Sequence, residues 1–196
     1  HPVEPGIGIS QKRRAYCGPP TDGGPVSATL WPAVTDPIRL AEVDDVATIL
    51  RGHASLPETL DRLTCLAAEL LEVPVSTLTF VEADRQVFAS SYGLPEPLRS
   101  VRQTPLEYSF CQHVVATGAP FIVRDAANDQ RLAGNRAVLE LGVAAYAGMP
   151  INGRTRRTLG ALAVVDYVAR DWTDDKLALL AELAQIAADE LGLGVL

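Results

Sequence analysis

The stretch VAAYAGMPINGRTRRTLGALAVVDY, residues 143–167, decides the fold because it predicts two strands joined by a turn. Residues 144–151 and 159–165 are rich in apolar side chains, and Asn152-Gly153 between them is a typical hairpin turn pair. The second run is apolar at nearly every position. Such a run is typical of a strand buried on both faces, so we expect residues 159–165 near the centre of a sheet.

Further strands are predicted before this stretch. Residues 75–82 and 86–92 alternate in character and flank the turn Ala83-Asp84-Arg85, which predicts a second hairpin. PFIVRDA, residues 120–126, predicts a short lone strand, whereas residues 93–105, with three prolines, predict a loop.

Helices are expected where apolar residues recur at steps of three and four, with capping residues at the ends. The predicted segments are residues 38–50, 55–71, 109–118, 135–141 and a long helix that begins after Thr173. Because hairpins outnumber crossovers, the sequence predicts an α+β fold, an antiparallel sheet of about five or six strands with helices gathered on one face.

The first 36 residues, rich in Pro and Gly, show no period and predict an extended arm before a single domain over residues 37–196. The chain begins with His1 rather than Met, so we expect it to be processed or trimmed, which leaves flanking domains open.

Composition restricts the class of protein. A net charge of −7 argues against a general nucleic-acid-binding surface. No apolar run reaches the ~18 residues that span a membrane, so no membrane partner is expected. The three cysteines, Cys17, Cys65 and Cys111, show no CxxC spacing, which favours a reducing, cytoplasmic setting.

Four strings in this order resemble motifs of the GAF domain, a sensor module of bacterial signalling proteins that is related to the phytochrome chromophore domain. They are SFCQH (109–113), VRDAAND (123–129) followed by Arg131, YAGMPI (146–151) and LGALAVVD (159–166). The resemblance covers about residues 38–191. Three positions depart from the family pattern toward aliphatic side chains: Leu132, Ala161 and Ala163.

The resemblance implies a non-catalytic regulatory domain that binds a small molecule, dimerises, or does both. It places a ligand pocket on the sheet face opposite the terminal helices, under short helices and loops. The side chains expected around this pocket are Phe88, Tyr92, Tyr108, Phe110, Cys111, His113, Phe121, Asp125, Arg131, Tyr146 and Met149. Tyrosine hydroxyls with Arg131 would suit a small anionic or polar ligand, and the resemblance identifies no ligand or cofactor.

Cys111 and His113 leave alternatives open. Residues two apart on a helix point about 200° apart, so the two side chains cannot form one catalytic pair or metal site. Cys111, near a helix start, is either a partial thiolate or a small buried hydrophobe. His113 either ligates haem or hydrogen-bonds a loop carbonyl. We favour the second alternative for each residue, and Gln112 between them disfavours the adjacent Cys-His arrangement that anchors a covalent bilin in the family.

The predicted C-terminal helix carries two apolar stripes. Leu177, Leu180, Ala184, Ala187 and Leu191 form a heptad-like seam, and Leu179, Leu183 and Ile186 lie beside it. One helix with two stripes can pack on its own sheet and on a second chain, which predicts a homodimer. The alternative is a single broad stripe that faces the core.

The expected function is therefore a cytoplasmic sensor that passes a signal to a partner or an output domain. Two other hypotheses stay open: an interaction module without a ligand, and a thiol redox switch or methionine sulfoxide reductase centred on Cys111. The reductase needs two exchanging thiols, and Cys17 and Cys65 are poor partners for Cys111.

Overall fold

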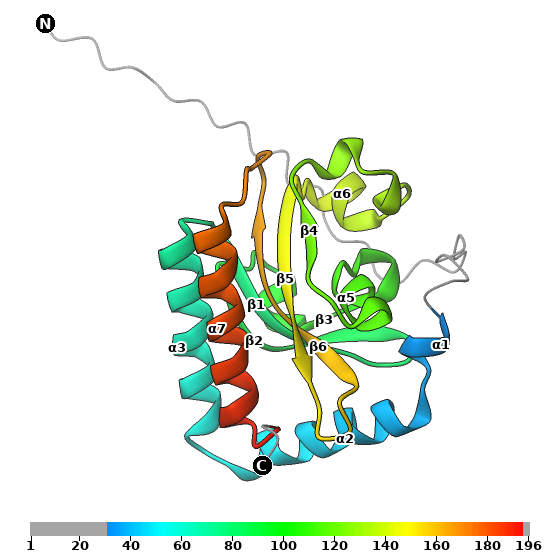
Figure 1. Ribbon diagram of the computed structural model, residues 1–196, viewed down its shortest axis with the longest axis vertical. Helices are drawn as coiled ribbons and strands as arrows, with labels where there is room; N and C mark the ends of the chain where they lie inside the picture. Colours follow the sequence, from blue (N-terminus) through cyan, green and yellow to red (C-terminus); the bar gives the residue numbers. More distant parts are fainter. Residues whose placement is uncertain (1–30, 194–196) are drawn as a thin grey trace, which may run out of the picture.

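The computed structural model describes residues 31–193, which form one six-stranded sheet with helices on both faces (Figure 1). The strands are β1 (Val75–Val81), β2 (Arg85–Tyr92), β3 (Gln103–Pro105), β4 (Phe121–Val123), β5 (Ala145–Asn152) and β6 (Thr158–Asp166). Their order is β3-β2-β1-β6-β5-β4, and every neighbouring pair is antiparallel. The predicted α+β class is confirmed, and β6 lies inside the sheet, as its apolar run predicts.

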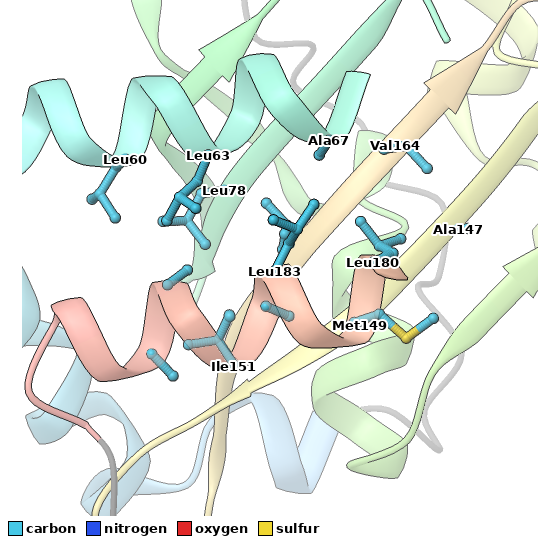
Figure 2. Close-up of a cluster of buried hydrophobic side chains, with 14 of the residues drawn as sticks. Leu60, Leu63, Ala67, Leu78, Ala147, Met149, Ile151, Val164, Leu180 and Leu183 are labelled. Carbon is cyan, nitrogen blue, oxygen red and sulfur yellow. The ribbon is translucent and has the colours of Figure 1, made fainter. Parts of the chain in front are cut away.

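Two long helices cover one face of the sheet. α3 (Leu56–Leu71) and α7 (Asp174–Glu190) lie side by side on it, and α2 (Pro37–Gly52) crosses near the β5–β6 turn (Figure 1). Figure 2 shows the side chains that meet there: Leu60, Leu63, Ala67, Leu78, Ala147, Met149, Ile151, Val164, Leu180 and Leu183. This aliphatic layer is the larger hydrophobic core, and its burial stabilises the helices on the sheet.

Short helices cover the opposite face. They are α4 (Leu98–Val101), η1 (Leu106–Tyr108), α5 (Cys111–Thr117), η2 (Ala126–Asn128), η3 (Gln130–Leu132) and α6 (Arg136–Leu141). A second apolar cluster, rich in aromatic side chains, lies between these helices and the sheet. The sequence pattern misses α4 and β3, because four-residue and three-residue elements are too short to show a period.

The end of the predicted extended arm is corrected. Trp31–Val34 form a short helix, α1, and the Val34 side chain is 0% exposed. Asp36 then caps α2 by accepting hydrogen bonds from the backbone N–H groups of Ile38 and Arg39. Helical structure therefore begins before residue 37, and the remainder of the arm, residues 1–30, lies outside the described residues.

A buried arginine joins α1 to the sheet. Arg39 is 2% exposed, and its guanidinium donates to backbone carbonyls of Ala33 (3.1 Å), Val34 and Val81 (2.7 Å). Hydrogen bonds between a side chain and distant backbone carbonyls do not produce a periodic sequence pattern. For this reason the sequence pattern assigns Trp31–Val34 to the arm.

Among residues 31–193, no helix combines the length and the apolar character that a membrane span needs.

Candidate functional site

A cavity of about 120 Å³ lies between the sheet and the short helices on the face opposite α3 and α7. The floor comes from β1, β2, β5 and β6, and the cover from the segment around α4, from η1, and from α5 and α6. Pro95 and Tyr167 line the cavity and are exposed, so it reaches the surface beside them. Its volume is close to the ~150 Å³ of an engineered protein cavity that holds benzene.

A chain of hydrogen bonds runs through one wall of the cavity. The backbone N–H of Gln112 donates to Ser109 Oγ (3.1 Å), and Ser109 Oγ donates to Gln86 Oε1 (2.7 Å). Gln86 Nε2 in turn donates to Thr104 Oγ1 (2.8 Å). Gln86, Thr104 and Ser109 are all buried, so this chain links α5 to the edge of the sheet without solvent.

The second wall contains a thiol and a phenol. Cys111 Sγ lies 3.3 Å from Tyr146 Oη, and both side chains are buried. Burial raises the pKa of the Cys111 thiol and holds the pKa of Tyr146 well above its usual value, so both groups are neutral near pH 7. Of the two alternatives for Cys111, the structure favours the small buried hydrophobe over the thiolate.

Gly148 allows Tyr146 to reach this position. A Cβ atom on Gly148 would lie 2.2 Å from the Tyr146 hydroxyl and 2.6 Å from Cζ, which is far inside van der Waals contact. The ring therefore lies flat over the strand at a residue without a side chain. Gly148 therefore provides the space that the Tyr146 ring occupies.

Five of the predicted pocket residues line the cavity: Phe88, Tyr108, Phe110, Cys111 and Tyr146. Six do not: Tyr92, His113, Phe121, Asp125, Arg131 and Met149. A role in ligand binding stays a prediction for the first group. For the second group the structure shows specific reasons for the difference.

Tyr92 lies on the sheet face opposite the cavity because β2 contains a bulge. Thr79 pairs with Phe88 and Leu78 with Ser90, so Ala89 is the extra residue. The bulge reverses the alternation, and Tyr92 pairs with Ser76 on the face of α3, where it is exposed. Arg102 stabilises the bulge, because its guanidinium donates to the carbonyls of Phe88 (3.1 Å) and Ala89.

Met149 also lies on the other face. Side chains alternate along β5, so Tyr146 and Met149, three residues apart, point to opposite sides of the sheet. Met149 packs in the aliphatic core with α7 (Figure 2).

His113, Phe121 and Arg131 form a separate stack outside the cavity. The rings of His113 and Phe121 are 4.5 Å apart and nearly parallel, and the Arg131 guanidinium lies 4.5 Å from the centre of the Phe121 ring. Asp129 neutralises Arg131 with a 2.9 Å contact, so this cation does not serve the cavity. Burial, with a contribution from Arg131, lowers the pKa of His113 to about 4. Within the described residues the His113 ring is held by stacking, and the hydrogen bond to a loop carbonyl that we expected is absent.

Asp125 is a capping residue. Its carboxylate accepts from the backbone N–H of Ala127 (3.2 Å) and from Asn128 Nδ2 (2.8 Å) at the start of η2. These contacts shape the loop after β4 rather than the cavity.

The sequence reasoning missed the polar side chains of the cavity floor. Thr77 and Thr79 of β1, with Gln86 and Thr104, line it and are buried. The signal was present in β1, where buried threonines alternate with Leu78 and Phe80 of the aliphatic core. A strand that is buried on both faces and polar on one of them indicates that the polar face borders a site.

The described cysteines do not form a redox pair. Cys65 lies on α3, where its thiol donates to the Glu69 carboxylate, whereas Cys111 lies on the opposite side of the sheet. Within residues 31–193 no group of three His, Cys, Asp or Glu side chains is arranged to hold a metal ion.

Sequence comparison agrees with this geometry. The GAF domain profile matches residues 55–191. A cyclic di-GMP phosphodiesterase of Pseudomonas aeruginosa is 29% identical over 150 residues, which are 76% of this chain and 24% of that protein. The chain thus spans about a quarter of the length of that curated relative.

Solved structures show the same fold. The GAF domain of an Acinetobacter phosphoenolpyruvate-protein phosphotransferase has a TM-score of 0.58 at 18% identity, with 79% of this chain and 93% of that chain covered. A far-red cyanobacteriochrome photoreceptor gives 0.58 at 16% identity, over 79% of this chain and 96% of that chain. Free methionine-R-sulfoxide reductase from Neisseria meningitidis gives 0.57 at 14% identity, over 78% and 87%. Because the family profile spans more than half of the chain, the chain belongs to the GAF domain family.

Proposed function

We propose that this chain is a non-catalytic sensor domain that binds a small molecule in the cavity beside Tyr108 and Tyr146. GAF domains are typically sensory or regulatory, and the observation that carries the proposal is the cavity itself, which lies between the sheet and the short helices and reaches the surface beside Pro95 and Tyr167. The lone buried thiol of Cys111, neutral and without a second thiol on its side of the described fold, supports binding rather than thiol chemistry.

The signal would leave the cavity through the end of β6. Tyr167 lines the cavity, and the neighbouring Asp166 accepts hydrogen bonds from the Tyr167 backbone (2.7 Å) and from Arg170 (2.8 Å). Arg170 also donates to the carbonyls of Leu71 and Glu72 at the end of α3. A ligand that prefers one position of Tyr167 would therefore bias how α3 and α7 pack.

Dimerisation through α7 is the second part of the proposal, and α3 contributes to the same surface. Leu66 and Leu70 on α3 and Ile186 on α7 are 43%, 49% and 45% exposed, although the two helices are packed side by side (Figure 1). A second copy of the chain would cover these side chains. The regulated activity would then belong to another part of a longer protein, as the short coverage of the phosphodiesterase relative suggests.

Ligand binding is tested by a thermal-shift and NMR screen of the purified chain against small metabolites, nucleotides and haem. We expect at least one compound to raise the melting temperature and to shift the amide signals around Tyr108 and Tyr146. If no compound binds while the chain still dimerises, the interaction module without a ligand is the better description. Retained peroxide sensitivity in Cys111→Ser excludes the redox switch, whereas its complete loss would support it.

The dimer is tested by analytical ultracentrifugation of Leu66→Glu and Ile186→Glu. We expect both variants to be monomeric and Leu139→Glu, which changes a leucine 71% exposed on α6, to remain dimeric. A monomeric parent chain, or dimers that survive both substitutions, would refute this interface.

A further inference from the structure

The described residues that line the cavity carry no formal charge. Their polar groups are hydroxyls, one thiol and the amide of Gln86. The arginine expected to attract an anion, Arg131, is bound to Asp129 outside the cavity. An ion moved from water into such a site loses its hydration without gaining a partner of opposite charge, which is strongly unfavourable.

Two backbone N–H groups in the first turn of α5 are already occupied. The backbone N–H of Gln112 is bound by Ser109 Oγ (3.1 Å), and that of His113 by the carbonyl of Phe110 (3.0 Å). These two backbone groups are therefore already bound within the protein and are not available to an anion.

The hydrogen-bond chain in the wall has a fixed direction. Ser109 Oγ accepts from the Gln112 backbone N–H and donates its hydroxyl hydrogen to Gln86 Oε1. This contact orients the Gln86 amide, whose Nε2 then donates to Thr104 Oγ1. Among the described residues, two hydrogens at the end of this hydrogen-bond series have no acceptor: the second amide hydrogen of Gln86 and the hydroxyl hydrogen of Thr104.

We propose that the cavity selects a neutral, compact ligand with a carbonyl oxygen, of the amide, lactam or imide class. This inference rests on the proposed function and specifies its ligand. The carbonyl oxygen has two lone pairs and accepts from Thr104 and Gln86, while the apolar part of the ligand packs against Phe88 and Phe110. The volume of about 120 Å³ suits one ring or a short branched chain.

The test compares pairs of molecules that have the same shape and differ in charge. The ¹⁵N-labelled chain is titrated at pH 7 with benzamide and benzoate, and with propionamide and propionate, each to about 10 mM because ligands of this size bind weakly. We expect each amide to bind at least tenfold more tightly than its carboxylate and to shift the amide signals around Gln86, Thr104 and Tyr146.

Thr104→Val removes the donor and keeps the shape of the side chain. We expect it to weaken amide binding by about fivefold, the value of one neutral hydrogen bond. Thr158→Val is the matched control, because Thr158 is also a buried strand threonine, 6% exposed, with its hydroxyl bound to Asn152 away from the cavity. Melting curves of both variants verify that they fold.

The outcomes separate this inference from the proposed function. A carboxylate that binds in the cavity as tightly as its amide overturns the ligand class and leaves the sensor function standing. Amide binding that Thr104→Val leaves unchanged overturns the assigned recognition. If neither pair binds, the amide class is wrong, and the wider screen described above decides separately whether the domain binds any small molecule.

Discussion

Substituting Gly148 by alanine tests whether Tyr146 is held by the absence of a side chain beneath it. The new Cβ would lie 2.2, 2.6 and 2.7 Å from Oη, Cζ and Cε1 of Tyr146, so the ring must move. It cannot move freely, because it is 2% exposed, stacks on Phe110 at 5.0 Å and contacts Cys111 at 3.3 Å.

The size of the effect follows from these contacts. Overpacking a filled interior costs about 1–3 kcal/mol, and loss of the contact with Cys111 adds about 1 kcal/mol. Alanine in place of glycine in a strand would otherwise stabilise by about 0.4–1 kcal/mol, because it restricts the unfolded chain. We therefore expect Gly148→Ala to lower the free energy of unfolding by about 2–3 kcal/mol.

Urea denaturation of a double-mutant cycle measures this coupling. In a Tyr146→Ala background the clash is gone, so Gly148→Ala should be neutral or slightly stabilising there, and the sign of its effect should reverse. The coupling energy should reach about 3 kcal/mol, well above the ~0.5 kcal/mol of independent sites. An equal loss of stability in both backgrounds would refute the reasoning, because the cost would then arise from the backbone rather than from the ring.

Three further predictions concern the charged groups of the fold. The pKa of His113 is about 4 in the folded protein and near 6.5 in the unfolded chain, so the unfolded chain binds more protons between these pH values. The free energy of unfolding should therefore fall by about 2 kcal/mol from pH 7 to pH 5. In His113→Phe the urea midpoint should change less over that pH range. Arg39→Met should cost about 3–5 kcal/mol, because it removes the partner of four backbone carbonyls. Arg124→Met, at a side chain 70% exposed, should cost under about 0.5 kcal/mol in the same assay. Arg102→Leu leaves the carbonyls at the β2 bulge without their donor and should cost about 1–2 kcal/mol, with faster hydrogen exchange confined to β2 and β3; unchanged exchange there would contradict the role of Arg102.

The elements that the sequence predicts well are those with a long, regular pattern. The run at 159–165 is apolar on both faces, and such a strand can only be satisfied inside a sheet. The hairpins follow from short turns between two strands, because a short turn permits only an antiparallel pair. The order of strands and helices, together with four family strings, therefore determines the architecture.

The site is predicted in part, because its residues depend on which face each strand presents. One extra residue at Ala89 reverses the direction of Tyr92, and an odd spacing separates Met149 from Tyr146. An aromatic or sulfur-containing side chain suits either face of a buried sheet, so composition does not distinguish the cavity from the core. The threonines of β1 carry that information more directly than the aromatic residues do.

By itself, the sequence of this protein determined the class of the fold and the family, since both depend on periodicity and on local strings. The tertiary structure alone decided the chemistry of the cavity. It turned Arg131 toward Asp129, buried Cys111 against Tyr146, and aligned Gln86 with Thr104 and Ser109 from three separate segments. The physical reason is that charge pairing, burial and hydrogen-bond direction are properties of neighbours in space, which are distant in the chain.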